Sequence, residues 1–314
     1  MYFYYHHTMK DWIQAARLRT LPLSLSGIIM GSLIARWKLL SEYRTWDIWI
    51  FLLALLVTLL FQVLSNYAND YGDGVKGTDT QRANEAEARA VASGRITALQ
   101  MRNAVILFSV LSFVATLGLL YRAFFPENLN DFYIFVGLGI ACILAAIGYT
   151  VGKKPYGYMG LGDVFVFIFF GWVSVMGSYY LFTKTFDLWL FLPASAVGFF
   201  SVAVLNLNNM RDIESDQKSG KHTLALKLGY KKAMIYQIIL LQLPLILILA
   251  YLLKNDVRSY YAYIFMILFL PLTKLRRNLM EITNPKDLDP FLKQVAITCF
   301  ITSILVGVGL NLIF

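Results

Sequence analysis

The stretch "NYANDYGDGVKGTD", Asn66 to Asp79, follows directly on the apolar run "FLLALLVTLLFQVLS", Phe51 to Ser65. The apolar run is typical of a membrane-spanning helix. Its end nevertheless carries two amides and three carboxylates within 14 residues. Carboxylates near hydrocarbon are costly and are therefore seldom placed there without a function. This junction predicts a polar site at one end of a membrane helix.

The composition of the whole chain agrees with a membrane location. The sequence has 314 residues, of which 58% are hydrophobic and 15% are charged, whereas a soluble domain has about 25% charged residues. Apolar runs of about 18 to 22 residues recur, and each is long enough to cross the hydrocarbon layer as a helix. We therefore expect an all-α polytopic membrane protein, with residues 1–314 forming one domain and residues 1–19 forming an N-terminal segment.

Nine membrane spans are predicted from these apolar runs. They are Leu21–Ala35, Ile48–Ser65, Leu99–Tyr121, Phe132–Val151, Val164–Phe182, Leu188–Leu205, Ala233–Leu253, Tyr260–Thr273 and Phe291–Ile313. The face of the N-terminus carries 21 of the 28 Lys and Arg residues. Under the positive-inside rule this bias places the N-terminus in the cytoplasm, together with the loops after the second and sixth spans. The net charge of +9 thus reflects topology and does not indicate nucleic-acid binding.

Two acidic motifs follow the second and the sixth span. The first contains Asn66, Asp70 and Asp73, and the second contains Asn208, Asp212 and Asp216. Their offsets of i, i+4, i+7 and i, i+4, i+8 place each set of oxygens on one face of a continuing helix. A single motif of this kind would fit a hydrated helix end. Two similar motifs on the same side of the membrane favour a shared site.

The chemistry of this site is predicted from its ligands. A carboxylate in hydrocarbon costs roughly 2.5–3.5 kcal/mol, and four close together would repel one another without cations. Oxygen ligands without His or Cys suit Mg²⁺, which usually binds one or two carboxylates together with substrate phosphates. The basic residues Lys76, Arg89, Lys153 and Lys221 follow on the same face. We therefore expect Mg²⁺ as the cofactor and a diphosphate as the bound anion.

These residues resemble the UbiA superfamily of intramembrane aromatic prenyltransferases. Asn208, Asp212 and Asp216 fit its NxxxDxxxD pattern, whereas in the first motif Gly74 stands at the position expected for the last acid, and the acid is Asp73. "RAVASG", residues 89–94, is similar to the RPxxSG segment of the superfamily without its proline, and "KHTLALKLG", residues 221–229, is similar to its stretch after the second motif. Tyr149 and Lys153 resemble its Tyr…Lys pair near the prenyl acceptor.

Three longer stretches are similar to the menaquinone-pathway branch of this superfamily. They are "RLRTLPLSLSGIIMGS" (17–32), "NYANDYGDGVKGTD" (66–79) and "YTVGKKPYGYMGLGD" (149–163). The resemblance implies transfer of a polyprenyl group from a polyprenyl diphosphate to 1,4-dihydroxy-2-naphthoate, with loss of CO₂, in the inner membrane of a bacterium. It also implies the residue roles. The predicted metal ligands are Asn66, Asp70, Asp73, Asn208, Asp212 and Asp216, with the four aspartates catalytic; the predicted substrate-binding residues are Arg19, Lys76, Arg89, Tyr149, Lys153 and Lys221.

Two alternatives to this interpretation stay open. Another branch of the superfamily, with a 4-hydroxybenzoate or lipid acceptor, would share every mechanistic residue. A cation-coupled transporter would also carry acids in membrane helices, although transporters place such sites near the bilayer midplane in broken helices. The acids of this chain lie at predicted helix ends, which favours the enzyme.

Overall fold

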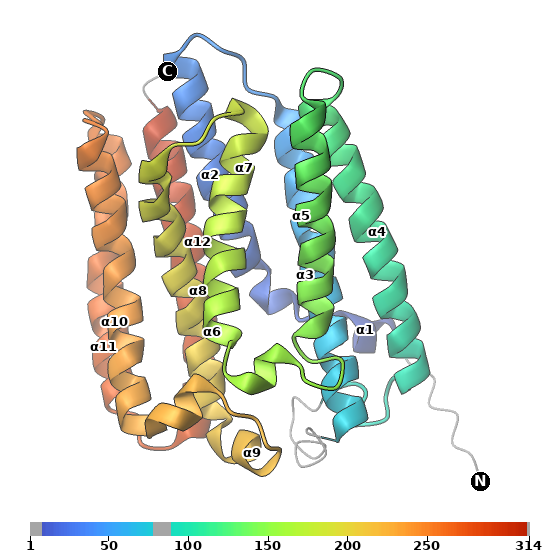
Figure 1. Ribbon diagram of the computed structural model, residues 1–314. Helices are drawn as coiled ribbons and strands as arrows, with labels where there is room; N and C mark the ends of the chain where they lie inside the picture. Colours follow the sequence, from blue (N-terminus) through green and yellow to red (C-terminus); the bar gives the residue numbers. More distant parts are fainter. Residues whose placement is uncertain (1–7, 78–88, 313–314) are drawn as a thin grey trace.

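The computed structural model describes residues 8–77 and 89–312 and leaves the side chain of Arg19 outside that description. Over these residues the secondary structure is helical, without strands. Long helices stand side by side as a bundle (Figure 1). The predicted all-α membrane fold is confirmed.

Eight of the nine predicted spans form helices that are long and apolar enough to cross a membrane, counted over the described residues. In several of them a short 3₁₀ or π segment joins the α-helix. The eight are α2 (Leu21–Ser41), α3 (Ile48–Lys76), α4 (Ala98–Phe124), α5 (Leu129–Gly148), α6 with η4 and α7 (Gly162–Val166, Phe167–Val173 and Ser174–Thr183), η5 with α8 (Leu188–Leu190 and Phe191–Arg211), α10 (Leu224–Lys254), and η7 with α12 (Pro285–Leu288 and Asp289–Asn311). The chain is therefore a multi-pass membrane protein.

The remaining predicted span, Tyr260–Thr273, is helical but divided. It forms the 3₁₀ helix η6 (Tyr260–Leu268) followed by α11 (Phe269–Met280). Pro271 lies in the first turn of α11, where its missing N–H costs little. At about 2.0 Å per residue for η6 and 1.5 Å for α11, the pair extends roughly 36 Å. That length suffices for a ninth crossing, and α11 runs beside α10 in Figure 1.

The helices that carry the acidic motifs extend beyond their apolar runs. α3 continues from the predicted end at Ser65 to Lys76, and α8 continues from Leu205 to Arg211. Short elements gather at this end of the bundle, among them η3 (Tyr156–Met159) and α9 (Ile213–Lys218) (Figure 1). Both motifs therefore lie at the same end of the molecule, as predicted.

Small residues set the distance between α2 and α7. A Cβ added to Gly27 would lie 2.1 Å from Ser174 Oγ, and one added to Gly31 would lie 2.1 Å from Ser178 Oγ. Glycine at both positions allows the two backbones to approach closely, as in other membrane helix pairs with small residues four apart. This contact fixes α7, and with it η4, against the N-terminal helices.

Candidate active site

A cavity of about 750 Å³ lies within the bundle and reaches the acidic motifs. Its wall is built by α2, α3, α4, α5, the α6–η4–α7 segment, α8 and α12. Eight of the predicted site residues line it, namely Asn66, Asp73, Arg89, Tyr149, Asn208, Asp212, Asp216 and Lys221. The two motifs, which are more than 130 residues apart in the sequence, therefore contribute to one site.

Asp73 is the most highly connected acid of this site. Its side chain is buried, and Oδ2 forms an ion pair with Arg89 and lies 3.5 Å from Lys221 Nζ. The hydroxyl of Tyr158 donates a hydrogen bond to Oδ1. Two cations and a phenol therefore hold this carboxylate ionised at the cavity wall.

Lys221 joins the two motifs directly. Its Nζ atom lies 3.5 Å from Asp73 Oδ2 and 3.8 Å from Asp216 Oδ1, and only 13% of its side chain is exposed. A cation between two buried carboxylates offsets their repulsion. The same ammonium group is placed to contact a phosphate that enters between the motifs.

The second motif differs from the prediction of a continuous helix. α8 ends at Arg211, Asp212 has φ −97° and ψ 10°, and α9 begins at Ile213. The guanidinium of Arg211 donates to Asn208 Oδ1 at 2.8 Å and to Asp212 Oδ2 at 2.9 Å, and it also pairs with Asp289. The expectation that i, i+4, i+8 share one face of an unbroken helix is therefore wrong here. A one-residue break turns the last acid toward the cavity.

Asp70 and Asn66 hold neighbouring chain segments. The carboxylate of Asp70 accepts hydrogen bonds from the N–H groups of Ala90 and Val91, both at 3.1 Å, and Asp70 is not among the residues that line the cavity. Asn66 donates through Nδ2 to the carbonyl of Ala16 at 2.8 Å. Asp70 thereby positions the segment that carries Arg89. Metal binding by Asp70 and Asn66 stays a prediction.

The other predicted basic residues are distributed unevenly. Lys76 Nζ donates to the carbonyl of Thr150 at 2.7 Å, at the edge of the site. Lys153 is exposed in a bend after α5 and does not line the cavity. Arg19 was predicted on the acceptor side, but its side chain lies outside the described residues. From the same N-terminal stretch Arg17 lines the cavity, with a left-handed backbone at φ 49°, a conformation that is uncommon for residues other than glycine.

Tyr158 is a site residue that the sequence analysis missed. Besides the hydrogen bond to Asp73, its ring lies 4.6 Å from Lys76 Nζ and 4.8 Å from Lys221 Nζ. Its carbonyl accepts the N–H of His222 at 2.9 Å. Tyr158 thus contacts basic residues that follow each motif, through cation–π interactions. Its only signal in the sequence was its place in the stretch 149–163, which is rich in glycine and aromatic residues.

Tyr149 is fixed by close packing against the η3 segment. A Cβ added to Gly157 would lie 2.7 Å from the Tyr149 carbonyl oxygen and 3.0 Å from its ring, so that glycine is required there. Tyr149 is the first residue beyond α5. Burial raises the pKa of its phenol well above the usual value. The hydroxyl therefore keeps its proton and can donate a hydrogen bond at the cavity wall.

Residues 28–312 match the UbiA prenyltransferase family. The chain belongs to this family. A 1,4-dihydroxy-2-naphthoate octaprenyltransferase from Haemophilus influenzae is 41% identical over 302 residues, which cover 96% of each chain. The protein of that name from Escherichia coli K12 is 40% identical and covers 96% of this chain and 95% of its own. The one from Mycobacterium tuberculosis is 38% identical over 72% of this chain and 73% of its own.

Solved structures of UbiA homologues share the fold. The apo structure from Aeropyrum pernix K1 superimposes with a TM-score of 0.63 over 94% of this chain and 98% of its own, at 15% identity. The homologue from Archaeoglobus fulgidus, bound to DMAPP and Mg²⁺, gives a TM-score of 0.55 over 94% of this chain and 99% of its own, at 13% identity. At such identities these likenesses establish the architecture alone.

The ligands present in this UbiA chain suit Mg²⁺. Asp73, Asp212 and Asp216 offer only oxygen atoms to the cavity, and hard oxygen ligands are the ones that Mg²⁺ prefers. Within residues 8–77 and 89–312 no group of three or more His, Cys, Asp or Glu side chains is close enough to hold one ion.

Proposed function

We propose that this protein transfers a polyprenyl group from a polyprenyl diphosphate to 1,4-dihydroxy-2-naphthoate, with loss of CO₂ and diphosphate. The observation that carries the proposal is the convergence of both acidic motifs, bridged by Lys221, at one end of a membrane cavity. The remaining wall is largely apolar, as a prenyl tail requires. The names of the relatives at 38–41% identity support the choice of acceptor.

The charged end of the cavity would bind the diphosphate. Asp73, Asp212 and Asp216 would hold Mg²⁺, with Asn66, Asp70 and Asn208 as the other predicted ligands. When bound, Mg²⁺ would supply positive charge that stabilises the leaving diphosphate. Arg89 and Lys221 already face the same space through their contacts with Asp73. They would neutralise the phosphate oxygens as negative charge develops.

The chemical step follows from the two substrates. The allylic C–O bond breaks, and its electron pair leaves with the diphosphate. The electron-rich ring of the naphthoate forms a new C–C bond to the prenyl carbon at the carboxyl-bearing position. The carboxylate then leaves as CO₂, and the electron pair of that bond restores the aromatic ring. The apolar part of the cavity lining would limit the access of water to the carbocation-like carbon.

The sidedness of the protein belongs to this proposal. The excess of Lys and Arg on the motif face supports a cytoplasmic location for the N-terminus and for the active-site loops. The diphosphate would then enter from the cytoplasm, and the prenyl tail would remain within the bilayer. We further propose the bacterial inner membrane as the location.

The test uses 1,4-dihydroxy-2-naphthoate labelled at its carboxyl carbon. Purified protein with a polyprenyl diphosphate and Mg²⁺ should release labelled CO₂ and diphosphate in equal amounts, and the product should hold no label. Prenylation of 4-hydroxybenzoate with the carboxyl retained, together with no reaction of the naphthoate, would overturn the proposed acceptor. The assignment as a prenyltransferase would stand. Failure to release diphosphate with either acceptor would count against the enzyme and favour transport.

A further inference from the structure

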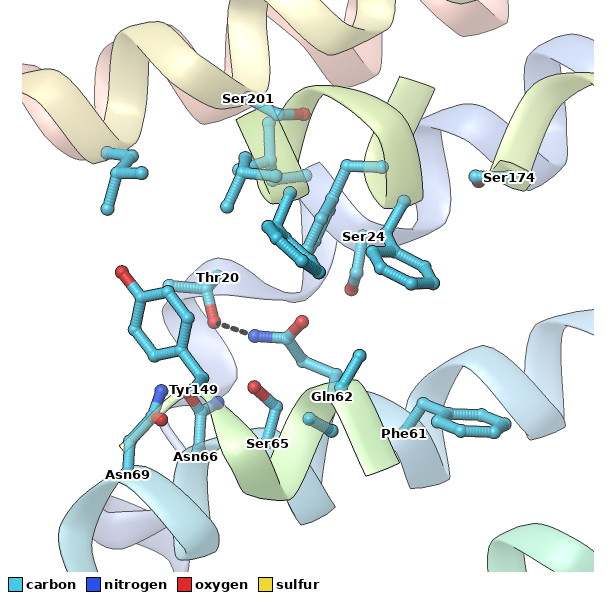
Figure 2. A pocket seen from close by; sticks show the side chains of 18 of the residues that line it. Thr20, Ser24, Phe61, Gln62, Ser65, Asn66, Asn69, Tyr149, Ser174 and Ser201 are labelled. Carbon is cyan, nitrogen blue, oxygen red and sulfur yellow. Dashed lines mark hydrogen bonds between the residues drawn. The ribbon is translucent and has the colours of Figure 1, made fainter. Parts of the chain in front are cut away.

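The lining of the cavity contains both aromatic and polar side chains. The α6–η4 segment contributes Phe165, Phe169 and Phe170, which suit a hydrocarbon tail. Another part of the lining, called here the polar wall, carries Thr20, Gln62, Ser65 and Asn69 close together (Figure 2). Polar side chains at membrane depth are rarely placed on a cavity wall without a ligand. The polar wall therefore needs an occupant other than the prenyl tail.

Gln62 is the deepest amide of this wall along α3. Its side chain is 9% exposed, and Nε2 donates to Thr20 Oγ1 at 2.8 Å. Thr20 Oγ1 in turn donates to the carbonyl of Arg17 at 2.8 Å, which fixes the orientation of the amide. Oε1 receives no hydrogen bond from any of the described residues and points into the open space in Figure 2. An amide oxygen that faces a cavity within the bundle is best matched by a ligand that donates a hydrogen bond.

The spacing along α3 indicates which part of a substrate reaches Gln62. Eleven residues separate it from Asp73, which is about 16 Å of helix, and seven residues separate it from Asn69, which is about 10 Å. The diphosphate and the reacting prenyl carbon would occupy the end next to Asp73. A two-ring aromatic acceptor would then extend along the helix from Asn69 toward Gln62.

We propose that Gln62 Oε1 accepts a hydrogen bond from the 4-hydroxyl group of the aromatic acceptor, and so makes Gln62 a residue that determines acceptor specificity. The assignment rests on the proposed function. In 1,4-dihydroxy-2-naphthoate the 1-hydroxyl group is ortho to the reacting, carboxyl-bearing carbon, whereas the 4-hydroxyl group is meta to that carbon and lies across the ring from the 1-hydroxyl group. The 4-hydroxyl group, which is farther from the diphosphate, would therefore lie next to the Gln62 amide, which is farther from Asp73. A site that pairs with a hydroxyl group discriminates strongly against an analogue that lacks it.

The experiment combines a substitution of Gln62 with a change of the aromatic acceptor. The probe is 1-hydroxy-2-naphthoate, which keeps the hydroxyl group beside the reacting carbon and lacks the 4-hydroxyl group. The variants are Gln62→Leu and, as a second replacement of similar length, Gln62→Met. Any difference in ring reactivity between the two acceptors is common to all proteins and cancels in the comparison. Gln242→Leu serves as the matched control, because Gln242 is an exposed glutamine of α10 that does not line the cavity.

We expect the unmodified protein to favour the dihydroxy acceptor by about tenfold to a hundredfold in kcat/KM, the cost of leaving one polar group without its partner. Gln62→Leu and Gln62→Met should lose most of this preference, with the KM for the prenyl diphosphate unchanged, and Gln242→Leu should retain it. Equal preference in the unmodified protein and in both Gln62 variants would overturn the assignment while prenyl transfer to the naphthoate stands. Absence of any naphthoate product from the unmodified protein would overturn the proposed function, and this assignment with it.

Discussion

The two acidic motifs begin alike, with Asn-x-x-x-Asp, but they are built differently. The first lies on the unbroken helix α3, where a residue at i+7 points within about 20° of the first position. Asp73 at i+7 therefore faces the cavity with Asn66. The second motif breaks for one residue at Asp212, and its last acid, Asp216, lines the cavity from i+8. The local path of the helix, and not the spacing alone, determines which acid reaches the site.

The same comparison explains the departure of the first motif from the family pattern. Its i+8 position is Gly74, and a Cβ there would lie 2.4 Å from Val91 Cγ1. The segment that Asp70 holds through Ala90 and Val91 occupies the space that a side chain at position 74 would need. An aspartate cannot fit at position 74 without displacing that segment, so the acid stands one residue earlier.

The motifs also differ in the origin of their counter-ions. Asp73 is paired with Arg89 and Lys221, which come from other parts of the chain. Asp212 is paired with its own neighbour Arg211, which also contacts Asp289. Lys221 is placed to contact a ligand at either motif, whereas Arg211 mainly stabilises the conformation of the second motif.

The largest expected effect concerns the side of the membrane that both motifs face. Single cysteines at Val75 and Gln217, both exposed at the motif end, should react with an impermeant thiol reagent only from the cytoplasmic side. Tyr43→Cys, at a position 99% exposed at the other end, should react only from outside. The background should carry Cys142→Ala and Cys299→Ala. Labelling of Val75→Cys and Gln217→Cys from opposite sides would place the two motifs on opposite sides of the membrane and would exclude a shared site.

Loss of an acid from either motif should stop turnover. We expect Asp73→Ala and Asp212→Ala each to lower kcat by about a thousandfold, because both carboxylates are proposed to hold the metal that would stabilise the leaving diphosphate. EDTA should have the same effect on the unmodified protein, and Mg²⁺ should reverse it. Asp256→Ala, at an exposed acid of the opposite end, is the control and should leave turnover unchanged. A folded, fully active Asp212→Ala variant would exclude a site shared by both motifs.

Asp70→Ala tests whether Asp70 stabilises the segment with Ala90 and Val91 in addition to binding the metal. Removing its carboxylate leaves the N–H groups of Ala90 and Val91 without their present partner. The free energy of unfolding should fall by about 1–3 kcal/mol, and turnover should fall because the segment with Arg89 is released. Thermal unfolding and a Mg²⁺ titration separate the two roles. Unchanged unfolding together with a higher Mg²⁺ requirement would assign Asp70 to the metal alone.

Much of the fold could be predicted from the sequence because a membrane imposes length and polarity on each helix. Eight spans appear as expected. The remaining predicted span, Tyr260–Thr273, is divided into η6 and α11 near Pro271, a feature that an apolar run does not reveal. The same reasoning placed both acidic motifs on helices at one end, since the excess of basic residues distinguishes the two faces.

The contacts within the site were less accessible to sequence reasoning. Helical spacing indicated that the acids of each motif point one way, but it could not reveal that Asp70 turns to the backbone of Ala90 and Val91. Tyr158 approaches Asp73 from 85 positions away in the sequence, and no spacing rule connects residues so distant. Likewise, Gln62 was hidden within an apolar run, where a lone amide resembles a tolerated polar residue.

The smallest expected effect distinguishes the ring of Tyr158 from its hydroxyl group. Tyr158→Phe removes the hydrogen bond to Asp73 and keeps the ring near Lys76 and Lys221. We expect the KM for the prenyl diphosphate to rise about tenfold, as for loss of one hydrogen bond to a charged group. Tyr156→Phe is the matched control, because that hydroxyl group donates to the carbonyl of Ala145 at 2.7 Å, and its KM for the prenyl diphosphate should not change. If Tyr158→Phe behaves like the control while Tyr158→Leu is impaired, the ring alone links the two halves of the site. If neither Tyr158 variant differs from the control, Lys221 is the sole connection between the motifs, and Tyr158 only packs against it.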